Sequence, residues 1–206
     1  MTLQDYLETH CDAEPPKLRA LYRHTHLTRL YPRMCTDAYQ GRLLVMLTQM
    51  IRPRRVLELG TFSGYSALCF AEGMDGKGVV DTVEIDPEHR DDLLELFKDS
   101  GVNLHIGDAL ELIPKLMSLH QYDLVFVDAN KRVYSDYYNA IMEHLHSGAY
   151  ILADNTLWDD KVLNPEASHD PQTAGICAFN DLVAADPRVE KIILPVRDGL
   201  SIIRVR

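Results

Sequence analysis

Two apolar stretches of the chain run directly into acidic and amide side chains. Residues 124–131 read LVFVDANK, in which Asp128 follows four apolar residues and Lys131 comes three positions later. Residues 149–158 read AYILADNTLW, in which an apolar run ends at Asp154 and Asn155. Strands of one parallel sheet share an edge at their carboxyl ends, and such sheets bind ligands there. The pattern therefore indicates a crevice lined by two carboxylates.

A glycine-containing turn precedes these acids. Residues 56–71 read VLELGTFSGYSALCFA, with Gly60 and Gly64 between an expected strand and an expected helix. Glycine permits a tight turn and lets a ligand approach the backbone closely. The spacing matches neither GxGxxG nor a P-loop. A plain strand-to-helix turn would give the same pattern, so the glycines alone are weak evidence for a ligand site.

Two further acids follow expected strands. Glu84 ends the strand after the glycine turn, where a carboxylate can accept hydrogen bonds from both hydroxyls of a ribose. Standing alone, Glu84 would be read as a solvated strand-end carboxylate. Asp108 follows the next strand and could cap the helix that begins there, or meet an adenine amino group. These two roles of Asp108 are compatible.

The alternation of β-rich and helical segments predicts an α/β fold, a parallel sheet with helices on both faces. The expected strands are 55–59, 79–85, 102–106, 122–127, 148–153, 189–196 and 200–206. Helices are expected near 64–73, 87–99, 109–119, 134–145 and 172–185, with 155–171 as a loop. Asp198-Gly199 is typical of a hairpin turn, so one strand is expected to be antiparallel. Before Pro53, three helices are expected, within 2–13, 15–30 and 36–52.

Bulk properties limit the partners. The 206 residues suit one domain, and the net charge of −10 argues against nucleic acid or an anionic membrane as the main partner. No apolar run approaches the ~18 residues of a membrane span, and the polar N-terminus does not read as a signal peptide. The four cysteines form no CxxC pair. A reducing, cytoplasmic location is therefore expected.

In combination, these segments resemble the cation-dependent class I O-methyltransferases, such as catechol O-methyltransferase and caffeoyl-CoA O-methyltransferase. The resemblance runs from about Tyr39 onward and rests on VLELGTFSGYS, VEIDPEH, GDALE, YDLVFVDANK, ILADNTLW, FNDLVAADPRVE and LPVRDGLSIIR. It implies a Rossmann-like methyltransferase fold with a seven-stranded, mostly parallel sheet, one antiparallel strand and extra N-terminal helices. Residues 1–206 would form a single domain, with 1–52 as a helical N-terminal cap and 53–206 as the cofactor-binding core. The resemblance also implies a homodimer.

The resemblance assigns roles to individual residues. S-adenosylmethionine would be bound by the glycine turn at its methionine part, by Glu84 at the ribose and near Asp108 at the adenine; the full set is Glu58, Gly60, Gly64, Tyr65, Ser66, Glu84, Asp108, Ala109 and Asp128. A divalent cation would be held by Asp128, Asp154 and Asn155, hard ligands that suit Mg²⁺ first and Mn²⁺ or Ca²⁺ next. Lys131 matches the general base of the family, beside Asp128 in the catalytic pair. Asn180 matches an asparagine near the metal.

These roles predict methyl transfer to a hydroxyl of a small catechol-like or vicinal-diol aromatic acceptor. A phenol with a pKa of about 10 is mostly neutral at pH 7, and a chelated divalent cation lowers that pKa. The segment after DNTLW has no aromatic residue before Phe179, unlike the acceptor-contacting segment of the plant caffeoyl-CoA enzymes, so caffeoyl-CoA itself is not the expected acceptor. Trp158 could wall the acceptor site or pack in the core. Met34 and Tyr39 match positions near the cofactor and acceptor.

Three alternatives stay open at this point. A nicotinamide-dependent dehydrogenase would share the fold pattern, but GxGxxG is absent. A metal-dependent hydrolase would use the same acids and leave the glycine turn and Glu84 unexplained. A non-catalytic binding protein of Rossmann-like fold would not need the complete set Asp128, Lys131, Asp154 and Asn155. The tyrosines at 134, 137 and 138 are expected to pack a helix, or to form a dimer surface.

Overall fold

Residues 2–164, 166 and 169–206 are described by a computed structural model of the chain. Within these residues seven strands form one sheet in the order β3-β2-β1-β4-β5-β7-β6. Their bounds are β1 Arg55–Leu59, β2 Val79–Glu84, β3 Val102–Ile106, β4 Leu124–Val127, β5 Tyr150–Asp154, β6 Val189–Leu194 and β7 Leu200–Val205. Among the described strands, β7 runs antiparallel to both of its neighbours, β5 and β6, and the other four adjacent pairs are parallel. The expected mostly parallel sheet with one antiparallel strand is confirmed.

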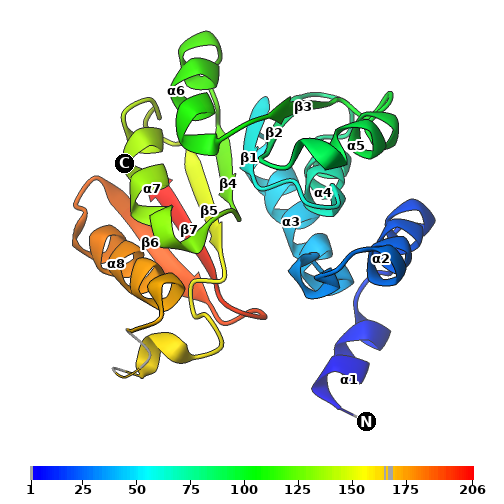
Figure 1. Cartoon of the computed structure of the whole chain (residues 1–206), viewed down its shortest axis with the longest axis horizontal. Helices are drawn as coiled ribbons and strands as arrows, with labels where there is room; N and C mark the ends of the chain where they lie inside the picture. Colours follow the sequence, from blue (N-terminus) through cyan, green and yellow to red (C-terminus); the bar gives the residue numbers. More distant parts are fainter. Residues whose placement is uncertain (1, 165, 167–168) are drawn as a thin grey trace.

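Helices cover both faces of this sheet (Figure 1). One face carries α2 (Pro16–Thr28), α3 (Ala38–Ile51), α4 (Tyr65–Met74) and α5 (Arg90–Leu96), and the other carries α6 (Ala109–Leu119), α7 (Tyr134–Met142) and α8 (Pro171–Ala185). The first helix, α1 (Leu3–His10), extends away from the sheet in Figure 1. The helices expected on both faces and before the first strand are therefore present.

The central strand β4 is wholly apolar because each side of the sheet packs under its own helices. Successive side chains of β4 alternate between two buried clusters: Leu124 and Phe126 belong to the cluster under α3 and α4, and Val125 and Val127 to the cluster under α6, α7 and α8. Helix α3 lies close against α4, since a Cβ added at Gly73 would lie 2.6 Å from the Cβ of Thr48. Apolar burial on both faces thus fixes the sheet whose edge carries the acids.

Several boundaries differ from the expected ones. The helix expected at 87–99 is split into a 3-10 turn, Pro87–His89, and α5, because Asp86 caps the turn through the backbone N–H of Glu88. The loop expected at 155–171 contains a 3-10 turn at Lys161–Leu163, and its residues 165, 167 and 168 lie outside the described part. The connection between β6 and β7 is longer than a tight Asp-Gly hairpin, because the strands pair only up to Leu194 and Leu200.

Candidate active site

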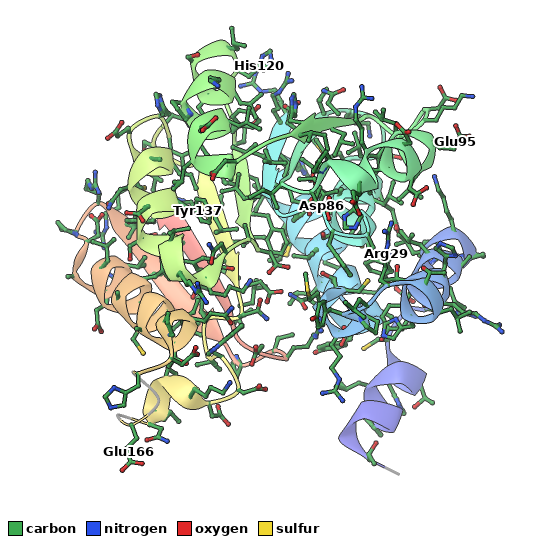
Figure 2. The ribbon with its side chains drawn as sticks, in the orientation of Figure 1. Arg29, Asp86, Glu95, His120, Tyr137 and Glu166 are labelled. Carbon is green, nitrogen blue, oxygen red and sulfur yellow. The ribbon has the colours of Figure 1, made fainter. Side chains whose placement is uncertain are left out.

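A cavity of about 940 Å³ lies at the carboxyl ends of the central strands, where the strand order reverses between β1 and β4. Side chains from both helical layers line it: in Figure 2, Tyr137 lies on one side, and Asp86 and Arg29 on the other. Eleven of the lining residues were expected or considered from the sequence: Met34, Gly60, Tyr65, Ser66, Glu84, Ala109, Asp128, Lys131, Asp154, Asn155 and Trp158. The structure therefore brings most of the expected site residues to one place.

The glycine turn follows β1, and each of its two glycines combines a positive φ angle with a crowded Cβ position. Gly60 has a φ of 102°, and a Cβ there would overlap the backbone carbonyl of Asp128. Gly64 has a φ of 80° at the start of α4, and a Cβ there would lie 2.7 Å from the Phe97 ring. The turn thus lets the ends of β1 and β4 touch, which brings the backbone around Gly60 beside the acid of β4.

Glu84 at the end of β2 is held by backbone donors. Its Oε2 accepts from the N–H of Phe62 at 2.7 Å, and its Oε1 accepts from the N–H of Asp86 at 2.9 Å. The side chain is almost fully buried yet lines the cavity. Each carboxylate oxygen retains a lone pair that can accept a hydrogen bond from a ligand hydroxyl.

Glu58 in β1 is completely buried and incompletely paired. Its Oε2 accepts from the hydroxyl of Thr82, while Oε1 meets no partner among the described residues. Burial raises the pKa of Glu58 to about 8, although hydrogen bonds from Ser66 and Thr82 oppose that rise. Glu58 itself does not reach the cavity lining, whereas Ser66 does. Glu58 is therefore mostly protonated at neutral pH and lies behind the cavity wall, with Ser66 between it and the cavity.

Lys131 links the acid of β4 to a buried tyrosine. Its Nζ donates to Oδ1 of Asp128 at 2.5 Å and to the Tyr134 hydroxyl at 2.8 Å, and the side chain is only slightly exposed. The Tyr134 hydroxyl also lies 3.1 Å from the carbonyl of Val127 and 3.2 Å from that of Asp154. Burial, with the nearby charges of Asp128 and Asp154, raises the pKa of Tyr134 well above its ordinary value. The hydroxyl therefore stays protonated and helps fix the lysine.

Asp154 ends β5 close to this pair. Burial and the charge of Asp128 raise the pKa of Asp154 to about 6, while Lys131 opposes the rise. Asn155 follows with a φ of 58°, and its Nδ2 donates to Asp198 at 3.3 Å, which leaves the side-chain carbonyl oxygen available. No cluster of three or more His, Cys, Asp or Glu side chains suited to a metal occurs in the described part of the chain. Two mutually repelling carboxylates and an amide oxygen nonetheless fit a hard divalent cation that keeps water ligands.

The family model for O-methyltransferases matches residues 8–206. The chain belongs to the O-methyltransferase family. Caffeoyl-CoA O-methyltransferase 1 of Eucalyptus globulus is 31% identical over an alignment of 218 residues. The alignment covers 90% of this chain and 88% of that protein. Catechol O-methyltransferase of Niastella koreensis is 30% identical over 186 residues, covering 85% and 84%. The solved O-methyltransferase of Bacillus cereus in complex with SAH superposes with a TM-score of 0.89 at 26% identity, covering 98% and 96%.

Membership of this family does not favour any of the three alternatives considered from the sequence, which were a dehydrogenase, a hydrolase and a non-catalytic binding protein. The catalytic class expected from the motifs, an O-methyltransferase, is therefore shown. None of the O-methyltransferase's helices, within the residues that the structure describes, is long and apolar enough to cross a membrane.

Some expected residues of this O-methyltransferase lie outside the cavity lining. The carboxylate of Asp108 caps α6 by accepting from the N–H of Leu110 at 2.8 Å, so the structure supports the first of its two possible roles. Asn180 donates to the carbonyl of Thr156 at 2.8 Å and also stays outside the lining. Tyr39 is absent from the lining as well, whereas Trp158 takes part in it.

The tyrosines of α7 have different environments. Tyr134 and Tyr138 pack edge-on against Phe179 of α8, with ring centroids 5.5 and 6.0 Å away, as expected for helix packing. Tyr137 instead lines the cavity. Other lining residues were not anticipated: Cys35 and Thr36 follow no strand, and Ile85, Asn130 and Arg197 lie in the motifs VEIDPEH, YDLVFVDANK and LPVRDGLSIIR without an assigned role. The position of Asn130 between Asp128 and Lys131 could have suggested it.

Proposed function

We propose that this O-methyltransferase transfers the methyl group of S-adenosylmethionine to a hydroxyl of a small catechol-like or vicinal-diol aromatic acceptor, with the help of a divalent cation. The observation that carries the proposal is the meeting of Asp128, Lys131 and Asp154 at one edge of the cavity, directly beside the Gly60 turn. This arrangement combines a cofactor pocket, a basic group and a hard-ligand set in one site.

The cofactor would lie along the ends of β1, β2 and β3. Glu84 is ready to accept from the ribose hydroxyls, and the backbone at Gly60 leaves room for the methionine part. Ala109 at the start of α6 would face the adenine. S-adenosylmethionine carries a sulfonium and an ammonium group, and Asp128 in the cavity lining supplies negative charge on this side. The relative solved in complex with SAH supports the same cofactor here.

The metal ligands would be Asp128, Asp154 and Asn155, with Mg²⁺ as the first choice and Mn²⁺ or Ca²⁺ next. When bound, the cation would supply Lewis acidity that lowers the pKa of the acceptor hydroxyl. Its positive charge would also relieve the repulsion that raises the pKa of Asp154.

The protein's own groups would bring about the transfer by positioning and proton removal. Lys131, held by Asp128 and Tyr134, would in its neutral amine form accept the proton from the acceptor hydroxyl at Nζ. The acceptor oxygen would attack the methyl carbon in line with the sulfur, so that a C–O bond forms as the C–S bond breaks. The products are a methyl ether and S-adenosylhomocysteine. Holding the two reactants in line contributes several kcal/mol, about 7–11 in favourable cases.

The test combines cofactor binding with metal-dependent turnover. S-adenosylmethionine is titrated calorimetrically into metal-stripped protein, and methyl transfer to a catechol panel is measured with Mg²⁺ or EDTA for the wild type, Asp154→Ala and the control Asp136→Ala, an exposed acid of α7. The expected result is cofactor binding in all three proteins and Mg²⁺-dependent transfer that only Asp154→Ala abolishes. Transfer that EDTA leaves unchanged would remove the metal from the proposal, and absence of cofactor binding would overturn it.

A homodimer, expected from the family resemblance, and the cytoplasmic location expected from the N-terminus and the cysteines are part of the same proposal. The prediction is a mass near twice the 23.4 kDa of the chain in sedimentation equilibrium. A mass that stays at 23.4 kDa across the concentration range would contradict it.

A further inference from the structure

The connection between β6 and β7 reaches the same edge of the sheet as the proposed active site. We call residues 196–199 the hairpin tip. Its fold is set by the N–H of Gly199, which donates to the carbonyl of Val196 at 2.9 Å, and by positive φ angles of 48° at Arg197 and 89° at Gly199. Two adjacent residues of the tip, Arg197 and Asp198, contact segments on opposite sides of the cavity.

Arg197 holds the segment that leads into α3. Its Nη1 donates to Oε1 of Gln40 at 2.7 Å, its Nη2 donates to the carbonyl of Cys35 at 3.3 Å, and its Nε lies 3.3 Å from Oδ2 of Asp37. Three acceptors thus share one planar guanidinium. A left-handed backbone is unfavourable for arginine, and these contacts compensate for it.

Gln40 extends this contact toward the proposed metal site. The side chain is fully buried in α3, and its amide faces the carboxylate of Asp154. The Nε2 atom makes no complete hydrogen bond with any residue that the structure describes. Because Arg197 engages Oε1, the amide NH₂ is directed away from the guanidinium and toward Asp154.

Asp198 holds the opposite wall, the segment that follows Asp154. Its backbone carbonyl accepts from the N–H groups of Leu157 at 2.8 Å and Trp158 at 3.2 Å, and its carboxylate accepts from the N–H of Asp159 and from Nδ2 of Asn155. Residues 158, 159 and 160 have φ angles of 51°, 52° and 57°. Three consecutive left-handed residues without glycine are strongly disfavoured unless neighbouring groups fix them.

The cavity lies between these two segments. Cys35 and Thr36 line it on the Arg197 side, Asn155 and Trp158 line it on the Asp198 side, and Arg197 itself takes part in the lining. We propose that Arg197 and Asp198 are positioning residues that fix both walls of the acceptor side, so that the hairpin tip acts as a clamp on the active site. The clamp rests on the proposed function, because the walls carry the groups assigned there to metal and acceptor.

Segment-resolved hydrogen–deuterium exchange of the full, metal-free and cofactor-free chain tests the clamp directly. The variants are Arg197→Gly, which suits the left-handed backbone, Arg197→Lys, which keeps the charge, and Asp198→Ala. Arg204→Ala is the matched control, because Arg204 pairs with Glu190 on the same hairpin, away from the tip. Arg197→Gly is expected to accelerate exchange about tenfold or more in 36–42 only, and Asp198→Ala in 155–161 only.

Steady-state kinetics with the catechol panel provide the second readout. Arg197→Gly is expected to lower kcat by about tenfold to 100-fold through misplacement of the acceptor wall, with the calorimetric S-adenosylmethionine affinity changed far less. Arg197→Lys should recover part of this loss, and Arg204→Ala should match the wild type. Unchanged exchange in both segments, or equal effects of Arg204→Ala, would overturn the clamp. Metal-independent transfer would overturn the proposed function instead, and the exchange data would still decide on the clamp.

Discussion

Buried carboxylates occur in two regions of this O-methyltransferase under opposite conditions. Asp81 in β2 is buried away from the cavity lining, and donors surround both of its oxygens: Arg55, Asn103, His105 and Tyr122, at 2.6, 3.1, 2.9 and 2.9 Å. At the cavity edge, Glu58 lacks a donor on one oxygen and Asp154 faces a second carboxylate.

The pKa values follow from this difference. Burial by itself would raise the pKa of Asp81, but the hydrogen bonds from His105, Arg55 and the other donors hold it well below its usual range. Burial raises the pKa of Glu58 to about 8 and that of Asp154 to about 6. Acids of the first kind stabilise the fold, and acids of the second kind cost stability that a cationic ligand can restore.

The largest expected effect is on the structural acid. Asp81→Ala leaves Arg55 without its buried partner and should lower the free energy of unfolding by about 3–5 kcal/mol. Urea denaturation measures it, with the exposed Glu95→Ala as control. The fraction of Asp81→Ala protein that remains folded should bind S-adenosylmethionine with the affinity of the wild type. A loss below about 1 kcal/mol would show that Asp81 does not stabilise the fold more than an ordinary surface acid does.

The second prediction concerns Glu58 and pH. Its folded pKa of about 8 lies above the ordinary value of 4.5, so its contribution to stability is full below about pH 4.5 and is lost as the pH rises through 8. Glu58→Gln removes this titration. Its stability relative to the wild type should therefore increase by about 4 kcal/mol from pH 5 to pH 9. Denaturation at both pH values measures the change, and a constant difference would contradict it.

Asp81 should show the opposite sign. Its folded pKa lies below the ordinary value, so its contribution is present above about pH 4 and is lost as the pH falls. Acid titration of the wild type and Asp81→Ala should therefore bring the two stabilities closer together by about 2 kcal/mol below pH 4. A stability difference between the two proteins that stays constant with pH would mean that the contribution of the hydrogen bonds around Asp81 does not depend on the charge of its carboxylate.

The third contrast is in ligand binding. At pH 9, where Glu58 is mostly ionised, Glu58→Gln removes a negative charge near the proposed site of the sulfonium and ammonium groups, and should weaken S-adenosylmethionine binding by about tenfold, or 1.4 kcal/mol. Calorimetry with the neutral-sulfur product S-adenosylhomocysteine should show a smaller loss. Equal losses for both ligands would argue against a charge effect on the sulfonium.

The smallest effect separates two buried tyrosine hydroxyls. Tyr134→Phe and Tyr138→Phe each remove one hydrogen-bonding hydroxyl and should each cost about 1 kcal/mol of stability. Only Tyr134→Phe frees Lys131, so only this variant should lower kcat. Thermal denaturation and turnover on the same preparations test the pair, and equal kcat values for the two would separate Tyr134 from the proposed catalytic group.

Local patterns were enough to predict the sheet, its helical layers and the acids at the strand ends. Period and turn signals depend on residues close in sequence, so RVLEL, the Gly60 turn and the strand ending at Asp154 could be recognised. The role of Arg197 could not be predicted, although the residue lies in LPVRDGLSIIR, because its partner Asp37 lies 160 positions away in the sequence. The alternative roles of Asp108 also required the structure, since only its contact with Leu110 shows the cap.

The antiparallel strand β7 has a consequence for the order of synthesis. In the sheet β7 lies between β5 and β6, although it is made after both. A nascent chain that has emerged only as far as β6 has β1, β2 and β4 available for pairing, yet lacks the strand that joins β6 to β5 and the tip that contacts Gln40 and Asn155. The parallel strands β1 to β5 can therefore pair with one another before β7 is made, whereas β6 can join the sheet only once β7 is present.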